Sequence, residues 1–376
     1  MNDEQRKAII QRVRRVVVKI GTDVISTDEG KLDYARVADL ARQVIALRGR
    51  GIEVVLVSSG AIGAGMGELK MTERPRRQPE LQAAAAVGQS KLMAAYDRCF
   101  VGSGFHAAQV LLTRQDVDDR TRYLNASNTL RTLLDLGCVP IINENDTISV
   151  EEIAFGDNDV LSALVSHLVQ ADLLIILSIV PGLYRDAAKR GEVVPLVERI
   201  DDGVFALVGA TKSRRGVGGM AAKLAAAQNA TDAGVPVVLA GGREREVLPR
   251  LLSGEALGTL FLPNAERLSS RKRWIGYGTR PRGRVTVNAG AKKAIVEGGK
   301  SLLAAGITAV SGSFERGALV SVLDESGDEF ARGLANYSAE ELAQIKGLRS
   351  DAIERVLGER PFDEAIHRDN LVLREM

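Results

Sequence analysis

The chain has 376 residues, of which 45% are hydrophobic and 26% are charged, as in ordinary soluble globular proteins. This length is sufficient for a large core and a second domain. The formal net charge of +2 excludes a strong overall attraction to nucleic acid or to membranes. The longest apolar run, Leu173 to Val180, is too short to span a bilayer. Asp3 and Glu4 at the N-terminus are not typical of a signal peptide, so we expect no membrane association.

The cysteines and histidines predict neither disulfides nor a metal centre. Cys99 and Cys138 have no CxxC spacing and lie in apolar stretches, which is typical of reduced cysteines in a cytoplasmic protein. His106, His167 and His367 are scattered along the chain, and His167 on an apolar helix is expected to be a packed residue and not a ligand. We therefore predict a cytoplasmic protein without a metal site made of protein ligands.

Apolar strands and amphipathic helices alternate along the first two-thirds of the chain. Strands are expected at residues 15–20, 52–57, 138–142, 173–177 and 235–240. Between them, one helix is expected after Asp33, a second ends at Gly137, a third starts near Gly156, and a fourth covers residues 221–233. Continuous apolar strands separated by such helices indicate an α/β fold, an open and mostly parallel sheet sandwiched by helices.

The pattern changes near residue 265. Short alternating strands are expected at residues 284–287 and 319–323, with glycines between them, which predicts a small, mainly β unit. We therefore expect an α/β domain at residues 1–265, a linker at 266–281, and a mainly β domain with a C-terminal tail at 282–376.

Residues 271–293 contain eight basic residues and no acid. Because Trp274 and Tyr277 lie among them, this stretch could bind RNA. A solvated linker or a strip at a domain interface is the alternative, and the small net charge favours it.

Polar residues follow several of the expected strands. Lys19 and Gly21, Ser58-Ser59-Gly60, Asn143-Glu144-Asn145-Asp146 and Ser178 stand at four strand ends. Ligands of open α/β sheets bind beyond the carboxyl ends of the strands. A second group of acids and amides, Gly156-Asp157-Asn158-Asp159, opens a helix. We therefore expect a site at this edge of the sheet.

The glycines at residues 216–219 precede a helix that carries Lys223 in its first turn. Glycines at a helix N-terminus allow backbone N–H groups to approach a phosphate. Residues 216–221 formally match GxGxxA, but they do not follow a strand, so a dinucleotide fingerprint is disfavoured. A flexible surface loop is the other reading, and Lys19 on a separate glycine turn favours the phosphate site.

These residue types suit phosphoryl transfer, whose catalysis is mostly positioning and neutralisation of charge. A carboxylate acceptor fits well, because a glutamate side chain with a pKa of ~4.3 is ionised at neutral pH and needs no general base. Lys19 could instead extend along the strand end to solvent, but its place between Val18 and Ile20 makes this less favoured.

An ordered set of motifs resembles the glutamate 5-kinases of the amino acid kinase family. The motifs are Val17-Val18-Lys19-Ile20-Gly21-Thr22, Val57-Ser58-Ser59-Gly60-Ala61, Ala84-Ala85-Ala86-Val87-Gly88-Gln89, Leu111-Leu112-Thr113-Arg114, Asn143-Glu144-Asn145-Asp146, Gly156-Asp157-Asn158-Asp159 and Gly218-Gly219-Met220 with Lys223. The tail, with Gly290-Ala291, Gly299-Lys300-Ser301-Leu302-Leu303, Gly306-Ile307 and Gly312-Ser313-Phe314 before Arg316-Gly317, resembles a PUA domain.

The resemblance implies a role for each matching residue. Lys19 and Lys223 would neutralise the transferring phosphoryl group, and Asp159 would hold their ammonium groups. The glutamate site would comprise Ser59, Gly60, Asp146, Asp157 and Asn158, with Asp146 at the α-ammonium group and Asn158 donating to a carboxylate. The nucleotide site would comprise Lys19, Gly21, Ser178, Ile179, Val217, Gly218, Gly219, Met220 and Lys223. The backbone amides of Gly21 and Gly60 are expected donors to phosphate or carboxylate oxygens.

The resemblance implies ATP-dependent conversion of L-glutamate to L-glutamyl 5-phosphate, the first step of proline biosynthesis. Mg²⁺ would be carried chiefly by the ATP phosphates. Proline is an expected feedback inhibitor, and a homo-oligomer, a dimer or a tetramer, is expected.

The chain departs from the family at two places in the nucleotide region. Ser178-Ile179 stands where Thr/Ser-Asp is common, and Val217 where Thr is common. Two rival functions stay open: an RNA-binding regulatory protein, and another acyl-phosphate-forming kinase such as acetylglutamate or aspartate kinase.

Overall fold

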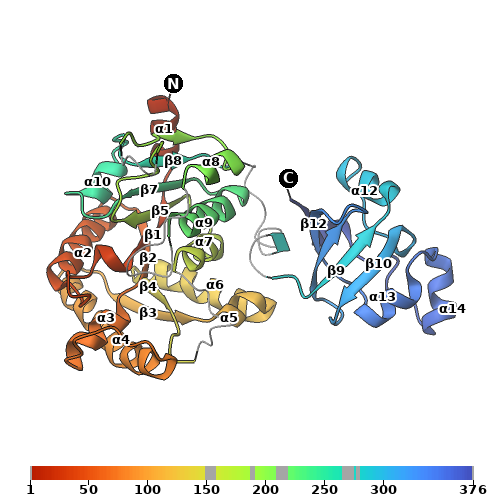
Figure 1. The fold of residues 1–376 in the computed structure, drawn as a ribbon, viewed down its shortest axis with the longest axis horizontal. Helices are drawn as coiled ribbons and strands as arrows, with labels where there is room; N and C mark the ends of the chain where they lie inside the picture. Colours follow the sequence, from red (N-terminus) through yellow and green to blue (C-terminus); the bar gives the residue numbers. More distant parts are fainter. Residues whose placement is uncertain are drawn as a thin grey trace. The chain divides into compact units, whose positions relative to one another are not determined.

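The structure, a computed structural model, describes residues 2–148, 158–186, 191–208, 219–264, 275–276 and 280–374. The chain divides into two compact units, Met1–Arg267 and Leu268–Met376 (Figure 1). Much of the predicted linker at residues 266–281 lies outside the described residues, so its limits stay a prediction.

The first unit is an α/β domain. Its strands are β1 (Arg15–Ile20), β2 (Glu53–Ser58), β3 (Ala107–Leu112), β4 (Val139–Glu144), β5 (Leu173–Ser178), β6 (Leu196–Val197), β7 (Val237–Gly241) and β8 (Thr259–Phe261). Its helices are α1 (Asn2–Gln11), α2 (Tyr34–Gly49), α3 (Ala61–Glu68), α4 (Gln78–Phe100), α5 (Arg114–Asp118), α6 (Arg120–Asp135), α7 (Asn158–Leu168), α8 (Asp202–Ala206), α9 (Met220–Asp232) and α10 (Val247–Leu251). All five predicted strands are present within one or two residues of their expected limits.

Within the described residues, the strands form an eight-stranded sheet in the order β3-β4-β2-β1-β5-β7-β8-β6. Its pairings are parallel except that of β7 with β8, which is antiparallel. In the register of the central strands, Lys19 of β1 lies between Val57 of β2 and Ile176 of β5. The carboxyl ends of β1, β2, β4 and β5 therefore meet at one edge of the sheet. The predicted open, mostly parallel sheet is confirmed.

Helices cover both faces of this sheet (Figure 1). On one face, α2, α4 and α10 bury apolar residues such as Leu40, Leu92 and Leu248 against the strands. The opposite face is covered by α6, α7 and α9. As predicted, Asp33 caps α2, and its carboxylate accepts a hydrogen bond from the backbone N–H of Arg36.

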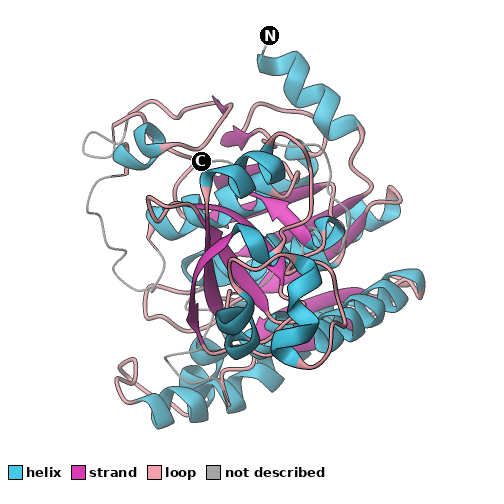
Figure 2. Cartoon of the chain, turned by 90° about the vertical axis from the view of Figure 1, so that its right-hand side faces the viewer, coloured by secondary structure: helices cyan, strands magenta, loops and turns pink. Residues whose placement is uncertain are grey.

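The N-terminal helix α1, beside the N marker in Figure 2, is tied to the domain by one arginine. The guanidinium of Arg6 donates to the carbonyl oxygens of Leu257 and Pro195 at 2.9 and 3.0 Å. These bonds satisfy a side chain that is only 3% exposed, as a buried charge requires.

The second unit is mainly β. Its five-stranded sheet, in the order β10-β9-β11-β12-β13, comprises β9 (Gly283–Val287), β10 (Ile307–Gly312), β11 (Leu319–Leu323), β12 (Glu329–Leu334) and β13 (Leu371–Leu373). The helices α12 (Ala289–Val296), α13 (Ala339–Ile345) and α14 (Ile353–Leu357) complete it. Its own core includes Val285, Val320, Phe330 and Tyr337, so the predicted small β unit is confirmed as a separately packed body.

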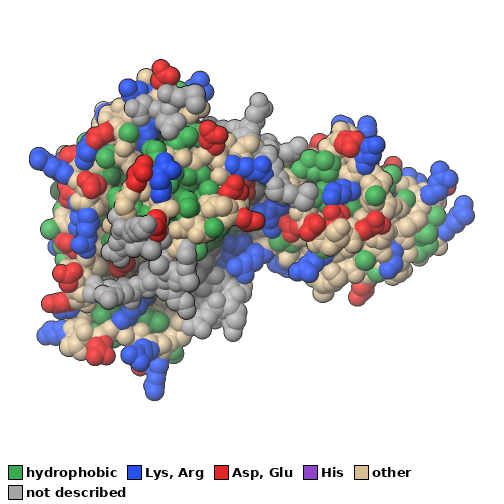
Figure 3. Space-filling model, turned by 45° about the horizontal axis from the view of Figure 1, so that its top comes forward, with side chains coloured by type: hydrophobic (Ala, Val, Ile, Leu, Met, Phe, Trp, Pro, Cys, Tyr) green, Lys and Arg blue, Asp and Glu red, His purple; other side chains and the backbone are tan. Residues whose placement is uncertain are grey.

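None of the described helices combines the length and apolar character that a membrane span requires. On the face of the α/β unit visible in Figure 3, acidic and basic side chains are interspersed.

Candidate active site

Two lysines from distant parts of the chain share one carboxylate. Lys19 Nζ, at the end of β1, lies 2.6 Å from Asp159 Oδ1, and Lys223 Nζ, in the first turn of α9, lies 2.8 Å from Asp159 Oδ2. Asp159 stands in the first turn of α7, which packs between β1 and α9. The structure thus brings together the three residues predicted to be catalytic.

The Lys19 side chain is 3% exposed, so it does not extend along the strand to solvent. Its burial follows from the position of β1 in the middle of the sheet, between β2 and β5. A buried ammonium group must be paired, and Asp159 supplies the opposite charge. The Lys223 side chain is 12% exposed, so the cluster is open at the α9 side.

The charge state of Asp159 follows from its surroundings. Burial would raise the pKa of this carboxyl, but the ammonium groups of Lys19 and Lys223 outweigh burial, so the pKa lies below its ordinary value. At neutral pH the cluster therefore holds two ammonium groups and one carboxylate, with a net charge of about +1. Such a centre suits an anionic group of a ligand.

A chain of amide side chains continues from Asp159 toward the glycine turn after β2. The amide nitrogen Asn158 Nδ2 donates to Ser59 Oγ at 2.8 Å and to Asn143 Oδ1 at 2.9 Å. Asn143 Nδ2 in turn donates to Gln89 Oε1 of α4 at 3.1 Å. These bonds link the ends of β2 and β4 to α7 and α4. Two residues of the predicted glutamate site, Ser59 and Asn158, are thus in direct contact.

Asp146 follows β4 and is partly buried. Its burial and the carboxylate of Glu144 raise its pKa to about 6, with Arg74 acting in the opposite sense. Burial and a neighbouring like charge both disfavour the ionised form. A cationic group of a ligand would relieve this repulsion, which is consistent with the predicted contact to an α-ammonium group.

Gly60 begins α3 with φ at +108°, in the left-handed region. A Cβ built there would lie 3.0 Å from Ile25 Cδ1. The backbone conformation therefore favours glycine at this position, and a larger residue would also crowd the end of the Ile25 side chain.

The nucleotide residues are only partly described. The backbone N–H of Gly21 donates to Leu177 O at 3.1 Å, so the expectation that this amide is free for a phosphate oxygen is wrong. Ser178 is buried and its carbonyl accepts from Gly242 N–H, whereas Ile179 is 57% exposed. Gly219 and Met220 start α9 beside Lys223. Asp157, Val217 and Gly218 lie outside the described residues.

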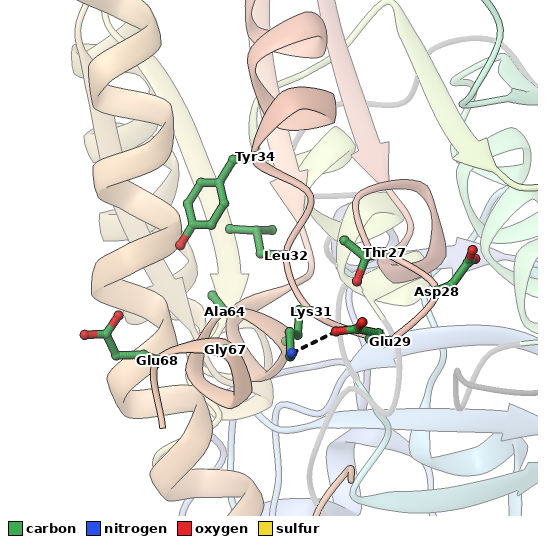
Figure 4. Close-up of a pocket in the computed structure, with 10 residues that line it drawn as sticks. Thr27, Asp28, Glu29, Lys31, Leu32, Tyr34, Ala64, Gly67 and Glu68 are labelled. Carbon is green, nitrogen blue, oxygen red and sulfur yellow. Dashed lines mark hydrogen bonds and ion pairs between the residues drawn. The ribbon is translucent and has the colours of Figure 1, made fainter. Parts of the chain in front are cut away.

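A separate groove of about 570 Å³ lies between the loop before α2 and the helix α3 (Figure 4). Thr27, Asp28, Glu29, Lys31 and Tyr34 line one side, and Lys31 pairs with Glu29 at 2.8 Å. None of the residues predicted for the active site lines this groove.

Two residues of this region had no predicted role. Gln89 is the last residue of the alanine-rich motif and had no expected function of its own, and neither had Tyr96, whose hydroxyl lies 2.9 Å from Ser58 Oγ. Both stand on α4 and bond to strand ends. The available signal for Gln89 was a glutamine next to the apolar run Ala83 to Gly88 of α4, since polar groups beside buried residues need partners.

Two ammonium groups surround one carboxylate at the edge of a mostly parallel sheet where its strands end. This arrangement is typical of α/β proteins that bind anionic groups such as phosphates. Comparison with known proteins makes this more specific. The model of the amino acid kinase family matches residues 14–241, and that of the PUA domain matches residues 283–357.

Similar proteins extend over the whole chain. Glutamate 5-kinase of Moorella thermoacetica is 46% identical over 99% of this chain and 100% of its own length. Glutamate 5-kinases of Pelobacter propionicus and Trichlorobacter lovleyi are 47% and 48% identical over 98% of this chain and 100% and 99% of their own lengths. The chain belongs to the amino acid kinase family, and within it to the glutamate 5-kinases. Among solved structures, UMP kinase from Bacillus anthracis is 16% identical, covers 67% of this chain and 97% of its own, and has a TM-score of 0.47.

Proposed function

We propose that this protein transfers the γ-phosphoryl group of ATP to the side-chain carboxylate of L-glutamate, which yields L-glutamyl 5-phosphate for proline biosynthesis. The observation that carries the proposal is the cluster in which Lys19 and Lys223 both pair with Asp159. The relatives over the full length of the chain bear the name of this activity.

The positive charge of the cluster suits a phosphoryl group while it is being transferred. An ammonium group has three N–H donors, so a lysine that pairs with Asp159 can donate to phosphate oxygens as well. Asp159 holds the two charges at fixed positions before the substrates arrive, so little reorganisation is needed when negative charge builds up between donor and acceptor. The acceptor carboxylate is already ionised at neutral pH, and no general base is required.

The glutamate end of the site is assigned to Ser59, Asn158 and Asp146. In the structure both N–H groups of Asn158 Nδ2 are engaged, with Ser59 and Asn143. No N–H of Asn158 is then left for a substrate, so the predicted donation from Asn158 to a carboxylate is not proposed again, and Asn158 contributes by holding Ser59. Ser59 keeps its own hydroxyl hydrogen for a substrate oxygen, and Asp146 offers a carboxylate to the α-ammonium group. Gly60 and Asp157 belong to the same proposed site.

Mg²⁺ is proposed as the companion of ATP. Among the described residues no group of three or more His, Cys, Asp and Glu side chains could hold a metal ion, and both oxygens of Asp159 are taken by ammonium groups. The phosphates are then its principal ligands, since Mg²⁺ is usually held by few protein groups. When bound, Mg²⁺ offsets the negative charge on the phosphates.

We also propose that Gly21, Ser178, Ile179 and residues 217–220 contact the nucleotide. Proline is proposed as an inhibitor. The protein is proposed to form a homo-oligomer in the cytoplasm. For Gly21, contact through the backbone N–H is no longer proposed.

RNA binding by the second unit is the weaker alternative. Of the basic stretch at residues 271–293, the part with Trp274 and Tyr277 lies outside the described residues, and no observation favours this function. Acetylglutamate and aspartate kinase activities are likewise not favoured, because the relatives at 46–48% identity are glutamate 5-kinases.

A hydroxamate assay tests the proposal. The purified chain is supplied with ATP, Mg²⁺, L-glutamate and hydroxylamine, and the acyl phosphate is trapped as a coloured hydroxamate. We expect product that depends on glutamate and ATP. A folded protein that makes none with glutamate, but does so with aspartate or acetylglutamate, would refute the substrate assignment.

A further inference from the structure

Gln89 lies behind the proposed glutamate site without belonging to any predicted part of it. It stands on α4 and is 9% exposed. Its Oε1 accepts from Asn143 Nδ2, and within the described part of the chain its Nε2 is buried without a hydrogen-bond partner. A buried amide with one unpaired polar atom is unfavourable, so its presence at this position calls for a physical reason.

Three hydrogen bonds connect Gln89 to Ser59 through Asn143 and Asn158, and each has a defined donor and acceptor. Asn143 donates to Gln89, so the carbonyl oxygen of Asn143 is left to face Asn158 and accepts from it. The same nitrogen of Asn158 donates to Ser59 Oγ. Gln89 thus orients the amide of Asn143, and Asn143 orients the amide of Asn158. The acceptor oxygen of Gln89 is the first member of this series.

The far end of this chain is the Ser59 hydroxyl, which accepts from Asn158. Its own hydrogen has no acceptor among the described residues. A hydroxyl that accepts a hydrogen bond becomes a better donor, because hydrogen bonds in series polarise one another. Ser59 is therefore prepared to donate to an anionic oxygen.

We propose that Gln89 is a positioning residue for glutamate: through Asn143 and Asn158 it fixes the orientation in which Ser59 presents its O–H to a substrate carboxylate. Because Gln89 Nε2 is buried, the residue acts through its neighbours and not by direct contact. The inference rests on the proposed function, since it assumes that Ser59 and Asn158 bind the amino acid.

The test compares Gln89→Met with Gln89→Glu in the full chain. Methionine keeps the length of the side chain but removes the acceptor, whereas a glutamate side chain keeps an acceptor oxygen for Asn143. We expect Gln89→Met to raise the KM for L-glutamate about tenfold with little change in the KM for ATP, and Gln89→Glu to recover most of that loss. Gln43→Met serves as the matched control, because Gln43 is also buried and hydrogen-bonded but lies on α2, bonded to Asp39 and Leu248. It should leave the KM for glutamate unchanged.

A double-mutant cycle separates positioning from a loss of packing. If Gln89 acts through Ser59, the Gln89→Met change should have little further effect on the KM for glutamate in a Ser59→Ala background, since residues of one network are not additive. Additive effects, or an unchanged KM in folded Gln89→Met, would overturn the inference.

Calorimetric titration with L-glutamate shows whether the inference about Gln89 or the proposed function is wrong. If the parent chain binds glutamate but forms no hydroxamate, the proposed reaction fails, and the effect of Gln89→Met on affinity still decides the inference. If the parent neither binds nor turns over glutamate, both fail.

Discussion

Lys223 and Asp159, 64 positions apart in the chain, form an ion pair of 2.8 Å in which the Asp159 side chain is completely buried. The second oxygen of the same carboxylate is 2.6 Å from Lys19 Nζ. One carboxylate thus fixes the distance between two ammonium groups that the chain delivers from a strand and from a helix.

Replacing Asp159 with asparagine should impair both stability and activity. The change removes the carboxylate with which both ammonium groups pair, and breaking a buried ion pair costs about 3–5 kcal/mol. Urea unfolding at pH 7 measures this loss, and Asp28→Asn, in the groove of Figure 4, is the surface control. Because the pKa of Asp159 is lowered on folding, its contribution is present above its ordinary value of 3.8 and disappears as pH falls below it. A difference between parent and variant that grows in acid would contradict this assignment.

Replacing Lys223 with methionine should reduce the hydroxamate rate without unfolding the chain. Lys19 still pairs with Asp159 in this variant, so the fold keeps a counter-charge, but one of the two cations at the phosphoryl group is lost. Removal of one such group lowers kcat by about 10²- to 10³-fold. Lys293→Met is the matched control, since Lys293 is on α12 and its side chain is 73% exposed. A Lys223→Met enzyme that retains the full rate would exclude Lys223 from the chemistry.

Glutamate binding should weaken as pH falls through about 6. Asp146 has a pKa raised to about 6 by burial and by Glu144, so below that pH it is protonated and no longer attracts an α-ammonium group. The KM for L-glutamate, measured between pH 5 and 8, should rise on the acid side. Asp146→Asn should bind weakly across the range, with the dependence lost. A KM in the parent that is flat over this interval would remove Asp146 from the ammonium site.

The close approach of α3 and α4 should not tolerate a side chain at Gly88. A Cβ there would lie 1.7 Å from Ala61 O, so the helices must separate, and overpacking of this kind costs about 1–3 kcal/mol. Because Ala61 follows Ser59 and Gly60, the KM for glutamate should rise as well. Gly67→Ala in α3 is the control, since a Cβ there meets nothing within 4 Å. If a Gly88→Ala variant were as thermally stable as Gly67→Ala, the contact between α3 and α4 would be able to accommodate a side chain, and this prediction would be wrong.

The limits of the central strands were predictable from sequence because β1 and β5 are continuous apolar runs. The edge strand β3 was not predicted, because Gln109 interrupts its apolar residues and leaves only the short run Val110-Leu111-Leu112. The helices α3 and α4 also had no predicted limits. Their contact depends on Gly65 and Gly88, at which a Cβ would collide with the backbone of the other helix, and this contact has no periodic signature along either segment.

At the site, the sequence identified which residues follow the strands, and the family resemblance implied that Asp159 pairs with Lys19 and Lys223, but the other hydrogen bonds were not predicted. Gly21 was expected to offer its amide to a ligand, yet this N–H completes a bond to Leu177 of the neighbouring strand. Gln89 had no predicted role, because its bond to Asn143 spans 54 positions.

The sequence by itself determined the mostly parallel α/β architecture, the separate β unit and the strand ends at which polar residues gather, because these depend on apolar periodicity and composition within short segments. The family resemblance implied that Asp159 holds Lys19 and Lys223, but only the tertiary structure gives the two ion pairs their geometry and shows the hydrogen bonds that run from Gln89 through Asn143 and Asn158 to Ser59. Those relations depend on the order of the strands and on how α4, α7 and α9 pack against them, and such long-range geometry leaves no trace in local spacing.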